Sequence, residues 1–255
     1  MISILTRVTR LSLVPRAPTL TRLMSERSPN DSPLYDGHIP TSLVQKLILA
    51  GGSSIISLTA PWRGDMVAVS GEVLPGTETA LRSLHDKMLG SEEGARVLSE
   101  RPLITAASTA SLHRLPTGTV GRTYADWMRG YNYSPDDRCP VQFVDDPDLA
   151  YVMTRYRQTH DLTHAVLGMP TTMVGEVVVK MVEGMQTGLP MCVLGGILGP
   201  VRFTDRQREQ YRKLLPWVES TGAEAELFLN VFYENRWEQD LQAVSYTHLT
   251  LPTKA

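Results

Sequence analysis

The chain has 255 residues, of which 42% are hydrophobic, and a formal net charge of -2. This length and apolar fraction predict one domain with a sizeable core, and the near-neutral charge argues against nucleic acid as a partner. Its two cysteines, Cys139 and Cys192, lie in different segments. They therefore support neither a disulfide framework nor a cysteine zinc site.

The first 25 residues have the composition of a mitochondrial transit peptide. They contain four arginines, no acidic residue and many serines and threonines, and arginines interrupt the only stretch that resembles a secretory signal. A disordered basic tail is the alternative. We therefore expect residues 1–30 to lie outside the fold and residues 31–244 to form the domain. No stretch reaches the ~18 consecutive apolar residues of a membrane span, so a soluble or peripheral protein is predicted.

Helices dominate the predicted elements of the first half. Apolar residues recur at helical spacing from Leu43 until Gly51, where this helix is expected to stop, and again from Leu81 to Met88. Ser91 then has the character of an N-cap for another helix that ends near residue 102. Alternating residues at 66–73 predict a short strand, and residues 131–145 read as a long loop.

The best-marked helix follows this loop. Asp146 suits the N-cap and Pro147 the first helical position, and a buried stripe continues every three or four residues through two histidines. Gly168 ends that helix. A second apolar helix is predicted from Thr171 to about Gly188, and a last helix over residues 224–244. Residues 245–255 change character abruptly and are expected to be a tail that is not native to the domain.

Metal-capable side chains gather on these two helices. At about 100° per residue, His160, Asp161 and His164 share one arc of roughly 100°, and the break after residue 167 lets the next helix present Glu176 to them. Two imidazoles and two carboxylates suit Zn²⁺, whereas two histidines with one carboxylate also match non-haem Fe²⁺. The sequence thus predicts a mainly α-helical single domain with a metal site between two consecutive helices.

A buried cluster without metal is the alternative for these residues. In that case Asp161 and Glu176 would pair with the histidines, or with Arg155 and Arg157 nearby in the sequence. The apolar helix that begins at Thr171, together with residues 191–200, would line a channel for a lipid tail or belong to an ordinary core.

The spacing of the four side chains resembles that of a known family. His160, Asp161, His164 and Glu176 match the HDxxH-x11-E signature of the coenzyme Q biosynthesis protein 4 family, and similarity extends through LGMPT, GEVVVK, QTGLPMC and NVFYENRWEQDL. It covers roughly residues 31–244. The resemblance implies a helical fold with Zn²⁺ on these four residues, while Fe²⁺, Mg²⁺ and Mn²⁺ stay open.

The resemblance also implies a location, partners and a reaction. The location is the matrix side of the mitochondrial inner membrane, as a peripheral protein, and the partners are other coenzyme Q biosynthesis proteins and a polyprenylated benzoate precursor lipid. The reaction is that of a lyase, in which a 4-hydroxy-3-methoxy-5-polyprenylbenzoate loses its C1 carboxylate, coupled to hydroxylation there. The four metal-binding residues would form the catalytic site, and a homodimer is a further expectation.

Two other functions compete with this one. A noncatalytic scaffold that binds lipid and organises the assembly could use the same metal for structure. A phosphohydrolase that uses its His-Asp pair would need further histidine and aspartate ligands from separate helices, and the sequence before residue 146 offers no convincing histidine for that purpose. An open coordination position would favour an enzyme over a scaffold.

Overall fold

The structure, a computed structural model, describes residues 32–60 and 62–247, and over these residues the predicted mainly helical fold is confirmed. The α-helices are α2 (Leu43–Thr59), α3 (Gly64–Val73), α4 (Thr77–Leu89), α5 (Glu92–Glu100), α6 (Ala106–Thr109), α7 (Val120–Tyr131), α8 (Pro147–Leu167), α9 (Met173–Thr187), α10 (Pro190–Leu198), α11 (Asp205–Glu224) and α12 (Leu241–Thr247). Single-turn 3₁₀ helices are η1 (Leu112–Arg114), η2 (Pro135–Asp137), η3 (Gly199–Arg202), η4 (Phe228–Asn230) and η5 (Tyr233–Asn235).

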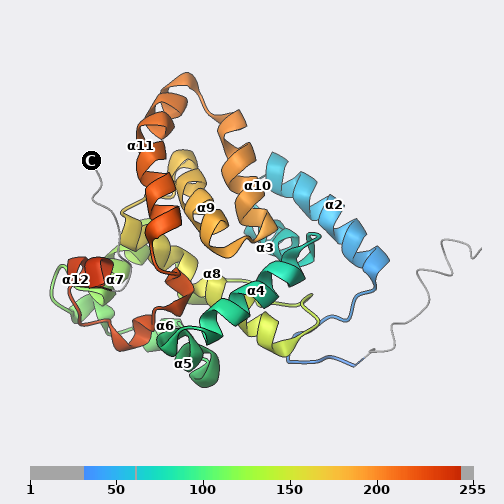
Figure 1. Cartoon of the computed structure of the whole chain (residues 1–255), viewed down its shortest axis with the longest axis horizontal. Helices are drawn as coiled ribbons and strands as arrows, with labels where there is room; N and C mark the ends of the chain where they lie inside the picture. Colours follow the sequence, from blue (N-terminus) through green and yellow to red (C-terminus); the bar gives the residue numbers. More distant parts are fainter. Residues whose placement is uncertain (1–31, 61, 248–255) are drawn as a thin grey trace, which may run out of the picture.

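Helix α8 forms the centre of the molecule, with α4, α7 and α9 packed around it (Figure 1). Its first half belongs to one apolar cluster with α4 and its second half to another with α7 and α9. Helices α10 and α11 pack on the far side of α9, and α2 packs on α3. The histidines of α8 therefore lie where the two halves of the core meet.

Local sequence explains why α8 and α9 begin and end as predicted. Asp146 accepts hydrogen bonds from two backbone amides of the first turn of α8, and Gly168 ends the helix with φ 59°. Thr172 caps α9 by accepting from the amide of Gly175, and Gly188 ends it with φ 67°. Both glycines adopt the left-handed conformation, which a residue without Cβ reaches at little energetic cost.

The structure corrects two predictions in the first half of the chain. Helix α2 does not stop at Gly51 but continues to Thr59, because a glycine inside a helix costs only about 1 kcal/mol and apolar residues resume after it. The predicted strand at residues 66–73 lies within helix α3. Helical packing places the carboxylate of Glu72 against the guanidinium of Arg157 in α8.

The C-terminal third differs most from its prediction. Residues 224–244 do not form one helix: α11 ends at Glu224, the two turns η4 and η5 follow, and α12 begins only at Leu241. Five of the six side chains at residues 228–233 are buried, and a single helix would have turned some of them to solvent. Helix α11 itself was not predicted, because it is largely polar and contains Pro216.

The two expected tails lie mostly outside the described residues, whereas the expected absence of a membrane span can be checked over the described helices. Residues 1–30 lie outside the described residues, and so do positions 248–255 of the tail at residues 245–255. Among the described residues, no helix combines the length and the apolar character that crossing a membrane requires.

Candidate metal centre

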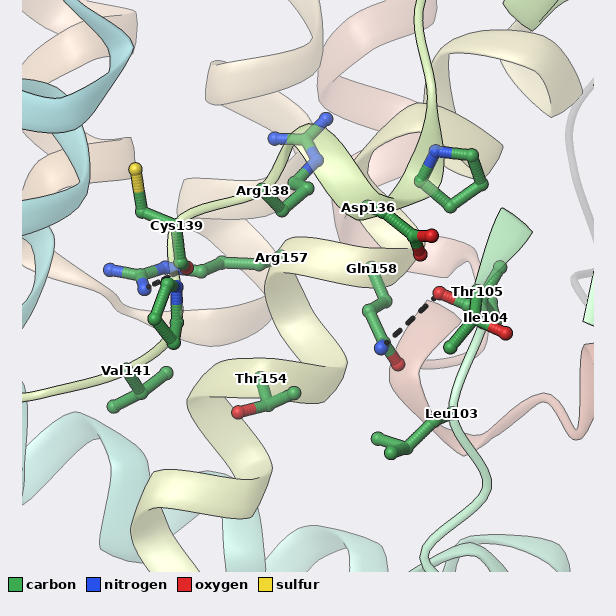
Figure 2. A pocket seen from close by; sticks show the side chains of 12 residues that line it. Leu103, Ile104, Thr105, Asp136, Arg138, Cys139, Val141, Thr154, Arg157 and Gln158 are labelled. Carbon is green, nitrogen blue, oxygen red and sulfur yellow. Dashed lines mark hydrogen bonds between the residues drawn. The ribbon is translucent and has the colours of Figure 1, made fainter. Parts of the chain in front are cut away.

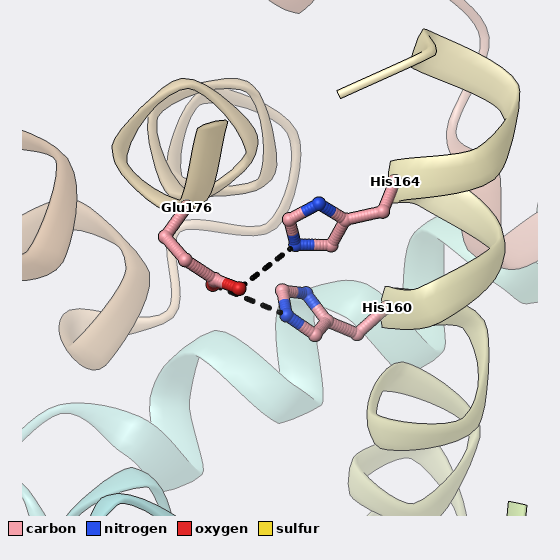
Figure 3. Close-up of side chains that lie close together, drawn as sticks. All are labelled: His160, His164 and Glu176. Carbon is pink, nitrogen blue, oxygen red and sulfur yellow. Dashed lines mark ion pairs between the residues drawn. The ribbon is translucent and has the colours of Figure 1, made fainter. Parts of the chain in front are cut away.

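Three of the four predicted ligands come together between α8 and α9 (Figure 3). His160 and His164 lie one turn apart on α8, and Glu176 lies in the first turn of α9. The Nε2 atoms of His160 and His164 are 3.7 and 3.4 Å from the two carboxylate oxygens of Glu176. The side chain of His164 is fully buried, whereas that of Glu176 is 38% exposed, so the cluster is accessible from one side.

Each imidazole is oriented by a partner of its Nδ1 atom. Nδ1 of His164 lies 3.0 Å from the carbonyl oxygen of Met169, and Nδ1 of His160 lies 2.7 Å from a carboxylate oxygen of Glu183. Because both partners accept hydrogen bonds, each Nδ1 carries the proton and each Nε2 of a neutral ring holds a lone pair. Both lone pairs are directed toward the carboxylate of Glu176.

This arrangement of acceptors fits a bound cation. Within the described residues, Nε2 of His164 is buried and has no hydrogen-bond partner, which is unfavourable for a polar atom. Two imidazole nitrogens and a carboxylate repel one another unless a proton or a metal ion lies between them. The donor set matches Zn²⁺ and Fe²⁺ sites that keep an open position, and the orienting hydrogen bonds match those found behind metal-binding histidines.

A buried polar network lies behind His160. Lys180 donates hydrogen bonds to Glu183 at 3.0 Å and to the hydroxyl of Tyr156 at 2.7 Å, and Tyr156 donates to Glu183 at 2.9 Å. The thiol of Cys192 donates to the Tyr156 hydroxyl at 3.0 Å. The ammonium of Lys180 thus compensates the carboxylate that orients His160.

Electrostatics fix the protonation of this network. Burial acts to raise the pKa of Glu183, but the charges of His160 and Lys180 outweigh it and lower that pKa to about 2. Burial acts to lower the pKa of Lys180, but Glu183 outweighs it and the pKa rises above its ordinary value. Burial also raises the pKa of the Cys192 thiol to about 12. At neutral pH, Glu183 and Lys180 are therefore charged and Cys192 is neutral.

The cluster itself favours positive charge beside Glu176. Burial acts to lower the pKa of His160, but the carboxylates of Glu183 and Glu176 outweigh it and raise the pKa. Burial acts to raise the pKa of Glu176, but its contacts with His160 and His164 hold that pKa far below its usual range. A proton on His160 and a divalent ion thus compete for the same space.

Asp161 does not join the other three side chains. It is buried and forms a two-pronged ion pair with Arg138, with Nε of Arg138 3.0 Å from Oδ2 of Asp161. Neighbouring residues of a helix point in directions about 100° apart, so the side chain of Asp161 points away from that of His160. Its partner Arg138 lines a pocket of 280 Å³ on another side of α8. Figure 2 shows Arg138 and Gln158 beside this pocket. The role of Asp161 as a metal ligand stays a prediction.

The arginines considered as partners of the acidic residues bind elsewhere. Arg155 pairs with Glu234 at 2.6 Å, and Arg157 pairs with Glu72. Neither ion pair involves Asp161 or Glu176. The alternative cluster without metal therefore lacks the arginine contacts that it named, whereas the pairing of Glu176 with the two histidines that it also named is observed.

Two residues of the site, Lys180 and Glu183, were not found from the sequence. They follow Glu176 at spacings of four and seven residues, which places all three on one face of α9. The rest of that helix is rich in apolar residues. A charged stripe inside an apolar helix was therefore the signal that could have identified them.

Comparisons with known proteins agree on one family. The model described as "Coenzyme Q (ubiquinone) biosynthesis protein Coq4" matches residues 35–250. The mitochondrial ubiquinone biosynthesis protein COQ4 homolog of Xenopus tropicalis is 47% identical over 220 residues, which cover 86% of this chain and 78% of the relative. The corresponding protein of Homo sapiens is 45% identical over 230 residues, which cover 89% and 86% of the two chains.

A solved structure also resembles this fold. It is the crystal structure of a candidate ubiquinone biosynthesis protein from Nostoc punctiforme, with a TM-score of 0.59 and 23% sequence identity. The match covers 78% of this chain and 93% of that chain. At this identity the likeness concerns the fold alone.

Proposed function

Because the chain belongs to the coenzyme Q (ubiquinone) biosynthesis protein Coq4 family, we propose that it is a metal-dependent lyase acting on a polyprenylated 4-hydroxybenzoate. Ubiquinone biosynthesis is the process that this membership assigns to it. The proposed step is the loss of the ring C1 carboxylate as carbon dioxide, with a proton taking its place at that carbon. The coupled hydroxylation at C1 requires in addition dioxygen as a two-electron oxidant. The observation that supports a chemical role is the buried Nε2 of His164, which faces a carboxylate and lacks a hydrogen-bond partner among the described residues.

We assign the binding of Zn²⁺ to His160, His164 and Glu176, with Asp161 as a proposed fourth ligand and Fe²⁺, Mg²⁺ or Mn²⁺ as alternatives. A divalent ion there would supply Lewis-acid stabilisation of the substrate carboxylate and of negative charge that develops on the ring. Glu183 and the carbonyl of Met169 hold the two imidazoles in one orientation, so that neither ring must rotate during turnover.

The surroundings of the site favour an enzyme over a structural centre. While Asp161 stays paired with Arg138, the other three ligands would leave one coordination position of the ion open, and the exposed edge of Glu176 gives a substrate access to it. A structural zinc site is instead closed by four protein ligands. The buried ammonium of Lys180, 3.3 Å from Nδ1 of His160, compensates the charge of Glu183 behind that imidazole. A noncatalytic scaffold would not need the open access to the ion.

Location and partners follow the family in this proposal. Relatives from vertebrates and from a fission yeast are named as mitochondrial, and no described helix could span a membrane. We therefore assign the protein to the matrix side of the mitochondrial inner membrane, as a peripheral member of the assembly of coenzyme Q biosynthesis proteins.

Turnover by the purified full chain tests the lyase. Metal-loaded and metal-stripped protein is given a 3-polyprenyl-4-hydroxybenzoate, and carbon dioxide and the ring product are measured. We expect release that depends on metal and is lost in His160→Ala and His164→Ala proteins that stay folded, whereas His113→Ala, at an exposed histidine, keeps it. Tight lipid binding without release, whatever the metal, contradicts the lyase and favours the scaffold.

A further inference from the structure

Helix α2 turns its apolar side away from the protein. Ala50 and Ser53 are buried where α2 packs against α3. Five of its larger apolar side chains are more than half exposed, whereas Val44, Leu49 and Ile56 are partly buried. The five are Leu43 74%, Leu47 52%, Ile48 57%, Ile55 64% and Leu58 53% exposed. A helix on the surface of a water-soluble protein has the opposite arrangement, with its large apolar residues facing the core.

Helix α10 repeats this inverted arrangement. Its buried side is formed by Cys192 and Gly196, and Gly196 lies against the backbone of Met181 in α9. Its outer side is apolar, and this continues into η3: Leu194 43%, Ile197 59%, Leu198 41% and Val201 74% exposed. Small residues inside and large apolar residues outside thus occur in two separate helices.

The two apolar surfaces form one face of the molecule. Both α2 and α10 contact α3, and α2 lies next to α10 in Figure 1. Arg202 of η3 donates a hydrogen bond of 3.1 Å to the carbonyl oxygen of Leu58, near the end of α2. Trp62, which follows α2, is 78% exposed. We call Trp62 and the nine exposed apolar residues named above the α2–α10 face.

The two segments that form this face carry no negative charge of their own. Residues 41–64 and 184–204 contain no aspartate or glutamate, and their only charged residues are Lys46, Arg63 and Arg202. Lys46 and Arg63 also contact acidic residues just outside these segments, whereas Arg202 binds a backbone carbonyl. An apolar surface with tryptophan and bordering cations matches the interface of an anionic bilayer in both polarity and charge.

We propose that the α2–α10 face lies on an anionic phospholipid membrane, with its leucines and isoleucines among the acyl chains and the guanidinium of Arg202 at the headgroups. This inference rests on the proposed membrane attachment and names the surface responsible. It also brings the membrane close to the metal centre, because Gly195 of α10 packs on Lys180 and Gly199 on Val177. Only α10 then separates the bilayer from the helix that carries Glu176.

Vesicle flotation of the full chain tests this face. We expect the protein to bind phosphatidylcholine vesicles that contain phosphatidylserine, and to bind vesicles of phosphatidylcholine alone more weakly. The Ile48→Glu, Ile197→Glu double variant should lower the partition coefficient about tenfold or more, since two apolar contacts are lost and two negative charges gained. Leu89→Glu, Leu103→Glu is the matched control, because both leucines are exposed to a similar extent elsewhere.

Three results would overturn the proposal. The first is wild-type protein that does not float with the vesicles, and the second is a double variant that binds them as well as wild type does. The third is a wild-type dimer that does not bind vesicles, together with a double variant that is a monomer. The last result, seen by light scattering, would assign the face to a second copy. Vesicle binding requires neither metal nor turnover, so failure of the lyase with normal flotation contradicts only the proposed chemistry.

Discussion

At the scale of single residues, the hydrogen bond from Nδ1 of His160 to Glu183 orients one imidazole of the candidate metal centre. We expect Glu183→Gln to lower the affinity for Zn²⁺ about 10- to 100-fold, since the amide can still accept from Nδ1 but no longer polarises the ring with a negative charge. Competition with a chromophoric chelator measures the affinity. Glu78→Gln, on the exposed side of α4, is the control, and equal affinities of the two folded variants would contradict this role.

The ion pair with Arg138 gives Asp161 a structural role in addition to its proposed role as a metal ligand. Asp161→Asn should lower the free energy of unfolding of the metal-free protein by about 1–3 kcal/mol, less than for a fully buried pair because Arg138 is 32% exposed. Urea unfolding in the presence of a chelator gives this value. Asp126→Asn, which breaks an exposed pair with Arg122, should change it by less than about 0.5 kcal/mol. An unchanged stability of Asp161→Asn would refute the structural role.

The metal affinity of Asp161→Asn tests whether Asp161 is also a metal ligand. A loss of metal binding would make Asp161 a ligand that leaves Arg138 when the ion enters. Helical spacing predicted that His160 and His164 share a face, and the break after residue 167 predicted that the next helix presents Glu176 to them. It could not foresee Arg138, since that contact joins α8 to a loop 23 residues away and depends on the tertiary fold.

At the scale of elements, the junction of α8 and α9 sets the position of Glu176. A Cβ atom at Gly175 would overlap the carbonyl oxygen of Pro170, so Gly175→Ala must shift the start of α9. We expect a loss of about 1–3 kcal/mol in the free energy of unfolding together with weaker metal binding. Gly130→Ala in α7 is the control, because a Cβ there has no described atom within 4 Å. Normal metal affinity in Gly175→Ala would mean that this junction does not position the ligand.

Elements were predictable where local chemistry decides them. The cap at Asp146 and the ending at Gly168 are encoded within a few residues, and α8 was predicted with nearly its observed bounds. The segment after α11 was not, because the run of buried apolar residues around Phe232 is consistent with a helix or with an irregular chain. Its conformation is decided by Arg155 and Glu93, which hydrogen-bond to Val231 and Phe232 from distant helices.

At the scale of the whole molecule, Arg155 ties the central helix to the C-terminal segment. It is fully buried and binds both carboxylate oxygens of Glu234 and the carbonyl of Val231. Arg155→Ala should lower the free energy of unfolding by about 3–5 kcal/mol, because it leaves a largely buried carboxylate without its partner. Thermal unfolding measures the loss, and Arg82→Ala, at an exposed pair, should have almost no effect. A similar melting temperature for both variants would contradict this contribution.

The pairing of charges around the metal centre has a consequence for ligand selection. Arg138 pairs with Asp161 and Lys180 with Glu183, so the carboxylate of Glu176 is left as one net negative charge when both histidines are neutral. A divalent ion changes this to one positive charge, and a monocarboxylate then restores electroneutrality. A ring that has lost its carboxylate could not do so, and under the proposed reaction we therefore expect a substrate acid to be retained in preference to its decarboxylated product.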